Sequence, residues 1–145
     1  METIDKRIIR FLQKHHVFTL ATSQNNEPYV CTCFYVYLEE ENLLVFTSDY
    51  STRHVRELEN QPRVAGAVAL ETMVTGRIQG IQLTGFCILL EGDLLASARA
   101  AYHKRFPVSL LMDLTLWSLA PDYIKMTHNN LGFGKKLVWE KPKNA

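Results

Sequence analysis

Apolar residues recur along the chain with two different periods, which predict helices in some segments and strands in others. Ile4, Ile8 and Leu12 fall on one side of an amphipathic helix that we predict for about residues 3–15, with Thr3 as its N-cap. Segments of alternating or continuous apolar character, bounded by turn residues, predict strands. The predicted strands cover residues 17–22, 29–38, 43–48, 63–70, 77–91, 123–127 and 135–140.

Two further helices are predicted between these strands. One begins at Ser51, whose hydroxyl can cap the free N–H groups of a first turn, and it ends before Pro62. The other covers residues 94–106, and after Pro107 the helical pattern continues over residues 108–117. Together with the strands, these helices predict an α+β barrel of about six antiparallel strands with two or three helices.

The strand predicted for residues 29–38 is apolar on both of its faces. One face carries Tyr29, Cys31, Cys33, Tyr35 and Tyr37, and the other carries Val30, Thr32, Phe34, Val36 and Leu38. A strand of this kind is covered on both sides. We therefore expect the barrel interior on one side, and a helix or a second copy of the chain on the other.

Composition restricts the class of protein. The chain has 145 residues, of which 47% are hydrophobic, and this suits a single globular domain over residues 1–145 with a frayed tail at 141–145. The formal net charge of +1 gives no basic surface for nucleic acid or for an anionic membrane. The sequence shows no signal-peptide pattern and no apolar run of about 18 residues, so a cytoplasmic protein is expected.

The three cysteines are an odd number, which favours a reducing compartment over a set of disulfides. Cys31 and Cys33 lie two apart on a predicted strand and therefore face the same side. Such a pair can belong to a zinc or redox site, but the sequence shows no second cysteine pair and no well-spaced histidine pair to complete one. We interpret the two thiols as core residues and predict no metal site.

The most informative chemistry lies where the third predicted strand leads into the second predicted helix. The first turn of a helix exposes N–H groups that have no partner inside the helix, and these groups attract anions. Arg53 adds a planar guanidinium, which can bind two phosphate oxygens at once. Ser51, Thr52, Arg53 and His54 therefore predict a phosphate site, although the same residues can simply cap a helix and point a charge toward water.

The order of these motifs resembles a known family. Thr-Ser, Ser-Thr-Arg-His and Asn-Gln-Pro-Arg-Val, within residues 47–64, are similar to the flavin-phosphate segment of the pyridoxamine-phosphate-oxidase-like FMN-binding split barrels. The likeness extends to the hairpin at residues 20–30 and to residues 78–85 and 102–107, so it covers nearly the whole chain in order. It is nearest to the small bacterial YhbP branch of that superfamily.

Members of the superfamily are typically homodimers that bind FMN at the subunit interface, and the resemblance implies a six-stranded split barrel, a homodimer and FMN here. The implied phosphate contacts are Ser51, Thr52, Arg53 and His54. The implied contacts to the ribityl chain and the ring are Thr47, Ser48, Thr32, Cys33, and either Gln79 or Gln82. From the other subunit, the resemblance brings Trp117 and the turn at residues 129–135 near the flavin.

Three departures from the family pattern change what we expect of the cofactor. Cys31 and Val36 stand where family members commonly have a basic residue on the second strand, and His54 replaces the usual Arg or Lys after the phosphate arginine. We therefore expect FMN to bind weakly. The C-terminal Arg-x-His signature that holds the substrate's phosphate is replaced by Asn-Leu-Gly-Phe-Gly-Lys-Lys at residues 130–136, so oxidation of pyridoxamine phosphate is not expected.

Two functions stay open at this point. The first is an FMN-dependent oxidoreductase of an unidentified small substrate, in which the flavin performs the electron transfer and no nucleophile–base pair is needed. The second is a dimeric binding protein that holds flavin, haem or another planar ligand without turnover. The sequence identifies no catalytic residue for either function, and the absence of a basic groove argues against a nucleic-acid partner.

Overall fold

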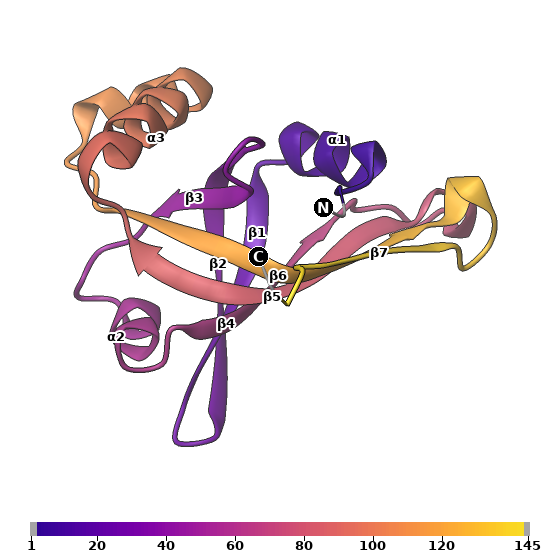
Figure 1. Cartoon of the computed structure of the whole chain (residues 1–145), viewed down its shortest axis with the longest axis horizontal. Helices are drawn as coiled ribbons and strands as arrows, with labels where there is room; N and C mark the ends of the chain where they lie inside the picture. The colour runs from indigo at the N-terminus through magenta and orange to yellow at the C-terminus, as the bar shows by residue number, and fades with distance from the viewer. Residues whose placement is uncertain (1–2, 144–145) are drawn as a thin grey trace.

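The computed structural model describes residues 3–143, in which the strands form one antiparallel sheet with three α-helices around it (Figure 1). The strands are β1 (Val17–Gln24), β2 (Glu27–Leu38), β3 (Leu43–Thr47), β4 (Arg63–Ala69), β5 (Gln79–Leu89), β6 (Leu116–His128) and β7 (Lys136–Glu140). The α-helices are α1 (Lys6–Lys14), α2 (Arg53–Asn60) and α3 (Gly92–Arg105), and short 3-10 turns cover Thr75–Arg77, Pro107–Leu111 and Asn129–Leu131. In Figure 1, α1 and α3 lie at the top of the view and α2 lies at the lower left.

The long strand β6 closes the sheet into a barrel. The strand order is β3-β2-β1-β4-β5-β6-β7, and β3 also pairs with β6, so six strands form a ring. The first part of β6 makes this closure, with Phe46 opposite Trp117. The second part pairs with β7 instead, with Ile124 opposite Trp139. The predicted α+β class and six-stranded split barrel are confirmed, and β7 extends the sheet beyond the ring.

Large apolar side chains fill the barrel interior. Ile8 and Leu12 of α1 and Val55 and Leu58 of α2 belong to the same buried cluster as the inward residues of the strands. Tyr35 donates its hydroxyl to the carbonyl oxygen of Leu12 over 2.7 Å, which satisfies the polar atom of this fully buried side chain. Both helices therefore seal the barrel with apolar side chains.

A second, smaller cluster lies under α3. It consists of Leu43, Val45, Leu90, Ala98, Tyr102 and Leu116. Val36 and Leu38 of β2 pack against it, whereas Val30 and Phe34 on the same face of β2 are 59% and 57% exposed. The cover that we expected on both sides of β2 is therefore present within this chain for its last residues, and its first half presents an apolar face to the surface.

The helical pattern predicted to continue over residues 108–117 is wrong. A short 3-10 turn is followed by β6, which begins at Leu116, so Trp117 lies in a strand. Residues 116–119 are all buried, and a strand buried on both faces lacks the alternation that would distinguish it from a buried helix. Pro121 lies within β6 opposite Gly85, beside a register shift, so the strand continues through the proline. A bulge of this kind tolerates the missing N–H of proline.

Two helices begin later than the sequence predicted. α1 begins at Lys6, because a carboxylate oxygen of Asp5 accepts the backbone N–H of Arg7 over 2.8 Å and acts as the N-cap in place of Thr3. α2 is capped by Thr52 instead of Ser51. Within residues 3–143, no helix has the length and apolar character needed to cross a membrane.

The tail that we predicted to be frayed begins as an ordered segment. The backbone N–H of Lys141 donates to the carbonyl oxygen of Asp122 over 2.8 Å, which holds the start of the tail against β6. The last part of the predicted tail, residues 144–145, lies outside the described residues.

The bulge between β5 and β6 generates a prediction about stability. A Cβ at Gly85 would collide with the carbonyl of Ala120 and approach the side chain of Leu119 to 2.9 Å. We expect Gly85→Ala to lower the free energy of unfolding by about 1–3 kcal/mol in urea denaturation, the usual penalty for overpacking. Gly76→Ala is the control, because a Cβ at Gly76 meets no atom within 4 Å. Equal stabilities of the two variants would contradict close packing at the bulge.

Candidate functional site

A tight turn leads from the end of β3 into α2. A carboxylate oxygen of Asp49 accepts the backbone N–H of Ser51 over 2.8 Å, and the hydroxyl of Thr52 donates to the carbonyl oxygen of Asp49 over 2.7 Å. The hydroxyl oxygen of Thr52 also accepts the N–H of Val55 over 3.4 Å. The turn and the cap therefore hold one another in place. Arg53 begins the helix, and its own N–H is one of those that helical geometry leaves without a partner inside the helix.

Arg53 is held on two sides by its own chain. Its Nε donates to Oε2 of Glu57 over 2.7 Å, and its guanidinium carbon lies 4.1 Å from the centre of the Tyr29 ring. Glu57 is only 5% exposed, and it also accepts the hydroxyl of Thr22 over 3.0 Å. The hydrogen bond from Arg53 holds the pKa of the Glu57 carboxyl below its usual range. The side chain of Arg53 is still 49% exposed, so its remaining donors can reach a ligand.

His54 lies beside Arg53 in the first turn of α2 and faces the end of β3. Its Nε2 is 2.8 Å from the hydroxyl oxygen of Ser48 and 3.4 Å from that of Thr52. Burial lowers the pKa of His54 from its ordinary value of 6.5. The imidazole is therefore mainly neutral at pH 7, and it adds hydrogen-bonding capacity to this corner without adding positive charge.

Two cysteines of β2 lie next to His54. The Sγ atoms of Cys31 and Cys33 are 3.8 Å apart, and one ring nitrogen of His54 lies with them so that the three atoms are all within 4.8 Å of one another. The hydrogen bond between the two thiols lowers the pKa of Cys31 and raises the pKa of Cys33, and burial raises the pKa of Cys33 further. Cys31 is half-buried and Cys33 is buried. We call these three residues the thiol–imidazole cluster.

Trp117 completes the same corner from inside the barrel. Its indole N–H donates to the carbonyl oxygen of Ser48 over 3.3 Å, and its ring lies 5.8 Å from that of Tyr50. Trp117 is only 4% exposed. Trp117 therefore supports the corner of its own chain. The resemblance implied that Trp117 would contact the flavin of the other subunit, but little of its surface is exposed for such a contact.

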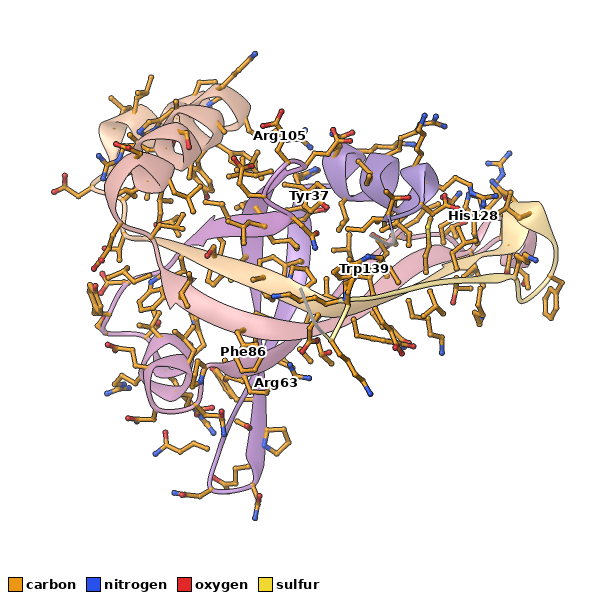
Figure 2. The ribbon with its side chains drawn as sticks, viewed as in Figure 1. Tyr37, Arg63, Phe86, Arg105, His128 and Trp139 are labelled. Atoms are coloured by element: carbon orange, nitrogen blue, oxygen red, sulfur yellow. The ribbon has the colours of Figure 1, made fainter. Side chains whose placement is uncertain are left out.

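The remaining predicted residues lie elsewhere. Thr32 and Gln82 are exposed and fall on one cross-strand row of the outward sheet face, which runs Thr32–Thr19–Ala67–Gln82. Gln79 lines a separate hollow of about 190 Å³ under the basic side of α1. His128, which is labelled in Figure 2, lines the same hollow. Gln82 therefore lies on the outward face of the sheet, and Gln79 does not.

Apart from Gln79, the predicted residues form two groups. The corner group consists of Thr47, Ser48, Ser51, Thr52, Arg53, His54, Cys33 and Trp117, and the outward row contributes Thr32 and Gln82. Thr47 donates its hydroxyl to the carbonyl oxygen of Thr115 over 3.0 Å, so this side chain fixes β3 to the segment before β6. Four hollows of about 190 to 590 Å³ on the described surface are lined by residues outside 47–54.

Sequence reasoning missed Glu57, Tyr29 and the grouping of Cys31 with His54. The spacing of Arg53 and Glu57, four residues apart on a helix, is a signal that the sequence carries. The stacking of Tyr29 on Arg53 and the approach of His54 to Cys31 depend on how α2 packs against β2, so the local sequence contains no signal for them.

The buried carboxylate of Glu57 predicts a pH dependence of stability. Its folded pKa lies below its ordinary value of 4.5, so its stabilisation is complete above pH 4.5 and is lost as the pH falls through the folded pKa. Between about pH 5 and about pH 3, thermal melts should show a smaller loss of stability for Glu57→Gln than for the unchanged protein. Glu59→Gln, at an exposed position of the same helix, should follow the unchanged protein. Parallel pH profiles for all three would remove Glu57 from this role.

Comparison with known proteins identifies the family. The family model described as pyridoxamine 5'-phosphate oxidase matches residues 4–128. A UPF0306 protein of Photorhabdus laumondii subsp. laumondii is 40% identical over 134 residues, which are 92% of this chain and 94% of that protein.

Two solved structures with the same fold bind different ligands. A heme binding protein from Mycobacterium smegmatis has a TM-score of 0.76 at 21% identity, and the match covers 97% of this chain and 60% of that one. This chain therefore spans about three fifths of that protein. A pyridoxamine 5'-phosphate oxidase-related, FMN binding protein from Nostoc punctiforme PCC 73102 has a TM-score of 0.68 at 17% identity, covering 95% of this chain and 85% of that one. On the family match and the identity to its relatives, the chain belongs to the pyridoxamine 5'-phosphate oxidase family, among the UPF0306 proteins, and has the FMN-binding split-barrel fold.

Proposed function

We propose that this protein is a homodimer that binds FMN weakly at the corner between β3 and α2 and acts as an oxidoreductase of a small substrate. The observation that carries the proposal is the start of α2, where an arginine held by Glu57 and Tyr29 stands beside free helical N–H groups in a chain of this family. The cofactor would supply hydride and electron transfer when bound.

The residues at the corner fit a phosphate group, with two features that weaken its binding. Arg53 and the first N–H groups of α2 are the donors that phosphate binding requires. His54 is mainly neutral, so it adds no charge. Hydrogen bonds from Ser51 lower the pKa of Asp49, so its side chain is a negatively charged carboxylate. This charge lies near Arg53 and the first N–H groups of α2 and opposes the binding of an anion there. Glu57 is already paired with Arg53, so the corner has one cation against two carboxylates, which supports loose binding of FMN.

The outward face of the sheet supports a dimer. Val30, Phe34, Phe86 and Ile88 are each between 46% and 59% exposed on the outward sides of β2 and β5. The guanidinium of Arg63 stacks on the ring of Phe86, with its carbon 4.9 Å from the ring centre (Figure 2). A second copy of the chain on the outward side of β2 would bury Val30 and Phe34 and would cover a ring lying near Thr32. The residues of this chain would bind and orient the flavin and exclude water from it.

The free thiols suit a reducing cytoplasm.

A binding protein without turnover is the second candidate. The heme binding neighbour from Mycobacterium smegmatis favours it, because that protein shares the fold with a higher TM-score than the FMN binding neighbour. The thiols and the imidazole at the corner are also of the type that binds haem iron.

Purification without added cofactor separates these candidates. We expect the protein to carry substoichiometric flavin, with its absorption spectrum, and to lose the yellow colour when a reduced nicotinamide is added without oxygen. A flavin spectrum that reduced nicotinamide leaves unchanged would favour binding without turnover. A haem spectrum with no flavin released on denaturation would overturn the FMN proposal.

Arg53 should be the main contributor to FMN affinity. Arg53→Ala should weaken binding by about 1.5–3 kcal/mol, the scale of a hydrogen bond to a charged group, or roughly 10- to 150-fold in Kd. Arg53→Lys should have a Kd between those of the unchanged protein and of Arg53→Ala, because it keeps the charge and loses the planar fork. Arg56→Ala is the matched control at an exposed position of α2 and should bind FMN as the unchanged protein does. Equal Kd values for Arg53→Ala and Arg56→Ala in a fluorescence titration would remove Arg53 from the site.

The dimer should depend on the outward face of β2. Sedimentation should give twice the chain mass of 16.7 kDa at micromolar concentration. Phe34→Asp should give a monomer with weaker FMN binding, because a charge would be buried in the interface. Met73→Asp, at a fully exposed loop position, should stay dimeric. A monomer for the unchanged protein would contradict an interface site.

A further inference from the structure

The thiol–imidazole cluster of Cys31, Cys33 and His54 has no part in the phosphate contacts proposed above except through His54. Two thiols and an imidazole form the donor set that soft and borderline divalent metals prefer. Cys87 shows the contrast, since it is 3% exposed and lies outside this cluster, as an ordinary core thiol does.

We propose that Cys31, Cys33 and His54 bind a zinc ion with three protein ligands and an open fourth position. The distance between the two sulfurs supports this assignment. A tetrahedral zinc with Zn–S bonds of about 2.3 Å holds its two sulfurs roughly 3.8 Å apart, and the Sγ atoms of Cys31 and Cys33 are 3.8 Å apart. The imidazole nitrogen lies within 4.8 Å of both sulfurs, so a small movement of one side chain completes the site.

The surroundings also suit a metal ion. Cys31 and His54 are partly exposed, which gives an ion a path to the site, while Cys33 is buried and anchors it to the strand. Two thiolates and a neutral imidazole around Zn²⁺ give a site without net charge, and such a site can lie at the edge of an apolar core. The hydroxyl oxygen of Ser48 is 2.8 Å from Nε2 of His54, which fixes the orientation of the ring at this corner.

A disulfide is a less suitable use of this pair. Cysteines two apart on an extended strand have Cα atoms roughly 6.7 Å apart, at the upper limit of about 6.8 Å for a disulfide. The metal, by contrast, bridges the sulfurs at the separation that they already have.

Cobalt(II) titration of the untagged, reduced and metal-free protein tests the proposal without any flavin. Cobalt replaces zinc in tetrahedral thiolate sites and produces a thiolate-to-metal charge-transfer band together with visible bands of a tetrahedral ion. We expect both bands to appear, to saturate at one cobalt per chain, and to disappear when zinc is added. Failure of these bands would overturn the metal site and leave the FMN proposal untouched, because FMN titration is a separate measurement.

Single substitutions identify the ligands. Cys31→Ser and Cys33→Ser should each reduce the charge-transfer band to about half, and His54→Gln should weaken zinc binding roughly 100-fold or more, beyond the 10–100-fold that loss of a supporting residue causes. Cys87→Ala and the exposed His16→Gln are matched controls that should keep the full spectrum and affinity. Circular dichroism checks that each variant is folded. A cobalt spectrum that survives in folded His54→Gln, or that is lost in Cys87→Ala, would overturn the assignment.

Discussion

The position of the candidate site depends on the pairing between β3 and the first part of β6. This pairing turns a sheet into a ring, and it ends where the chain leaves β3 for α2. Thr47 and Ser48 both bond to the carbonyl oxygen of Thr115, through the hydroxyl and the backbone N–H respectively, and the indole of Trp117 bonds back to Ser48. The turn into α2 therefore starts from the end of β3, where three hydrogen bonds hold the backbone to the start of β6. A helix start held in this way keeps its donors in a constant direction.

The sequence predicted the barrel because most of its strands are apolar segments bounded by turn residues, and because its motifs follow the order of the split-barrel family. It failed at β6, since Leu116 and its neighbours are buried on both faces and show no period that separates a strand from a helix. The capping residue of α2 was misplaced by one position for a similar reason. Asp49 binds the N–H of Ser51, and the cap then passes to Thr52, a choice among consecutive polar residues that local pattern does not decide.

The corner itself was predictable in part. Arg53 and His54 follow one another in the chain, so their common location at a helix start could be inferred from the sequence. Cys31 lies on a different strand, and its approach to His54 follows from the packing of α2 against β2. The prediction of no metal site rested on the lack of a second cysteine pair or a well-spaced histidine pair. One histidine from a distant element can also complete a set of zinc ligands.

His54 belongs to both the proposed phosphate site and the proposed zinc site. As a mainly neutral imidazole it contributes little to holding an anion, and a neutral imidazole is the form in which histidine binds metals. A corner with Arg53 on one side and two thiols on the other therefore presents different chemistry to phosphate and to a soft cation.

The link between Arg53 and Glu57 has a consequence for how long a ligand stays. Any anion that draws the guanidinium toward itself takes the nearest cation away from a carboxylate that is 5% exposed, and leaves it with the hydroxyl of Thr22. The buried negative charge opposes that movement, so ligand capture and ligand escape are more nearly balanced than at an unattached arginine. An anion therefore gains less from Arg53 than it would from an arginine without a partner, and its departure returns the guanidinium to Glu57.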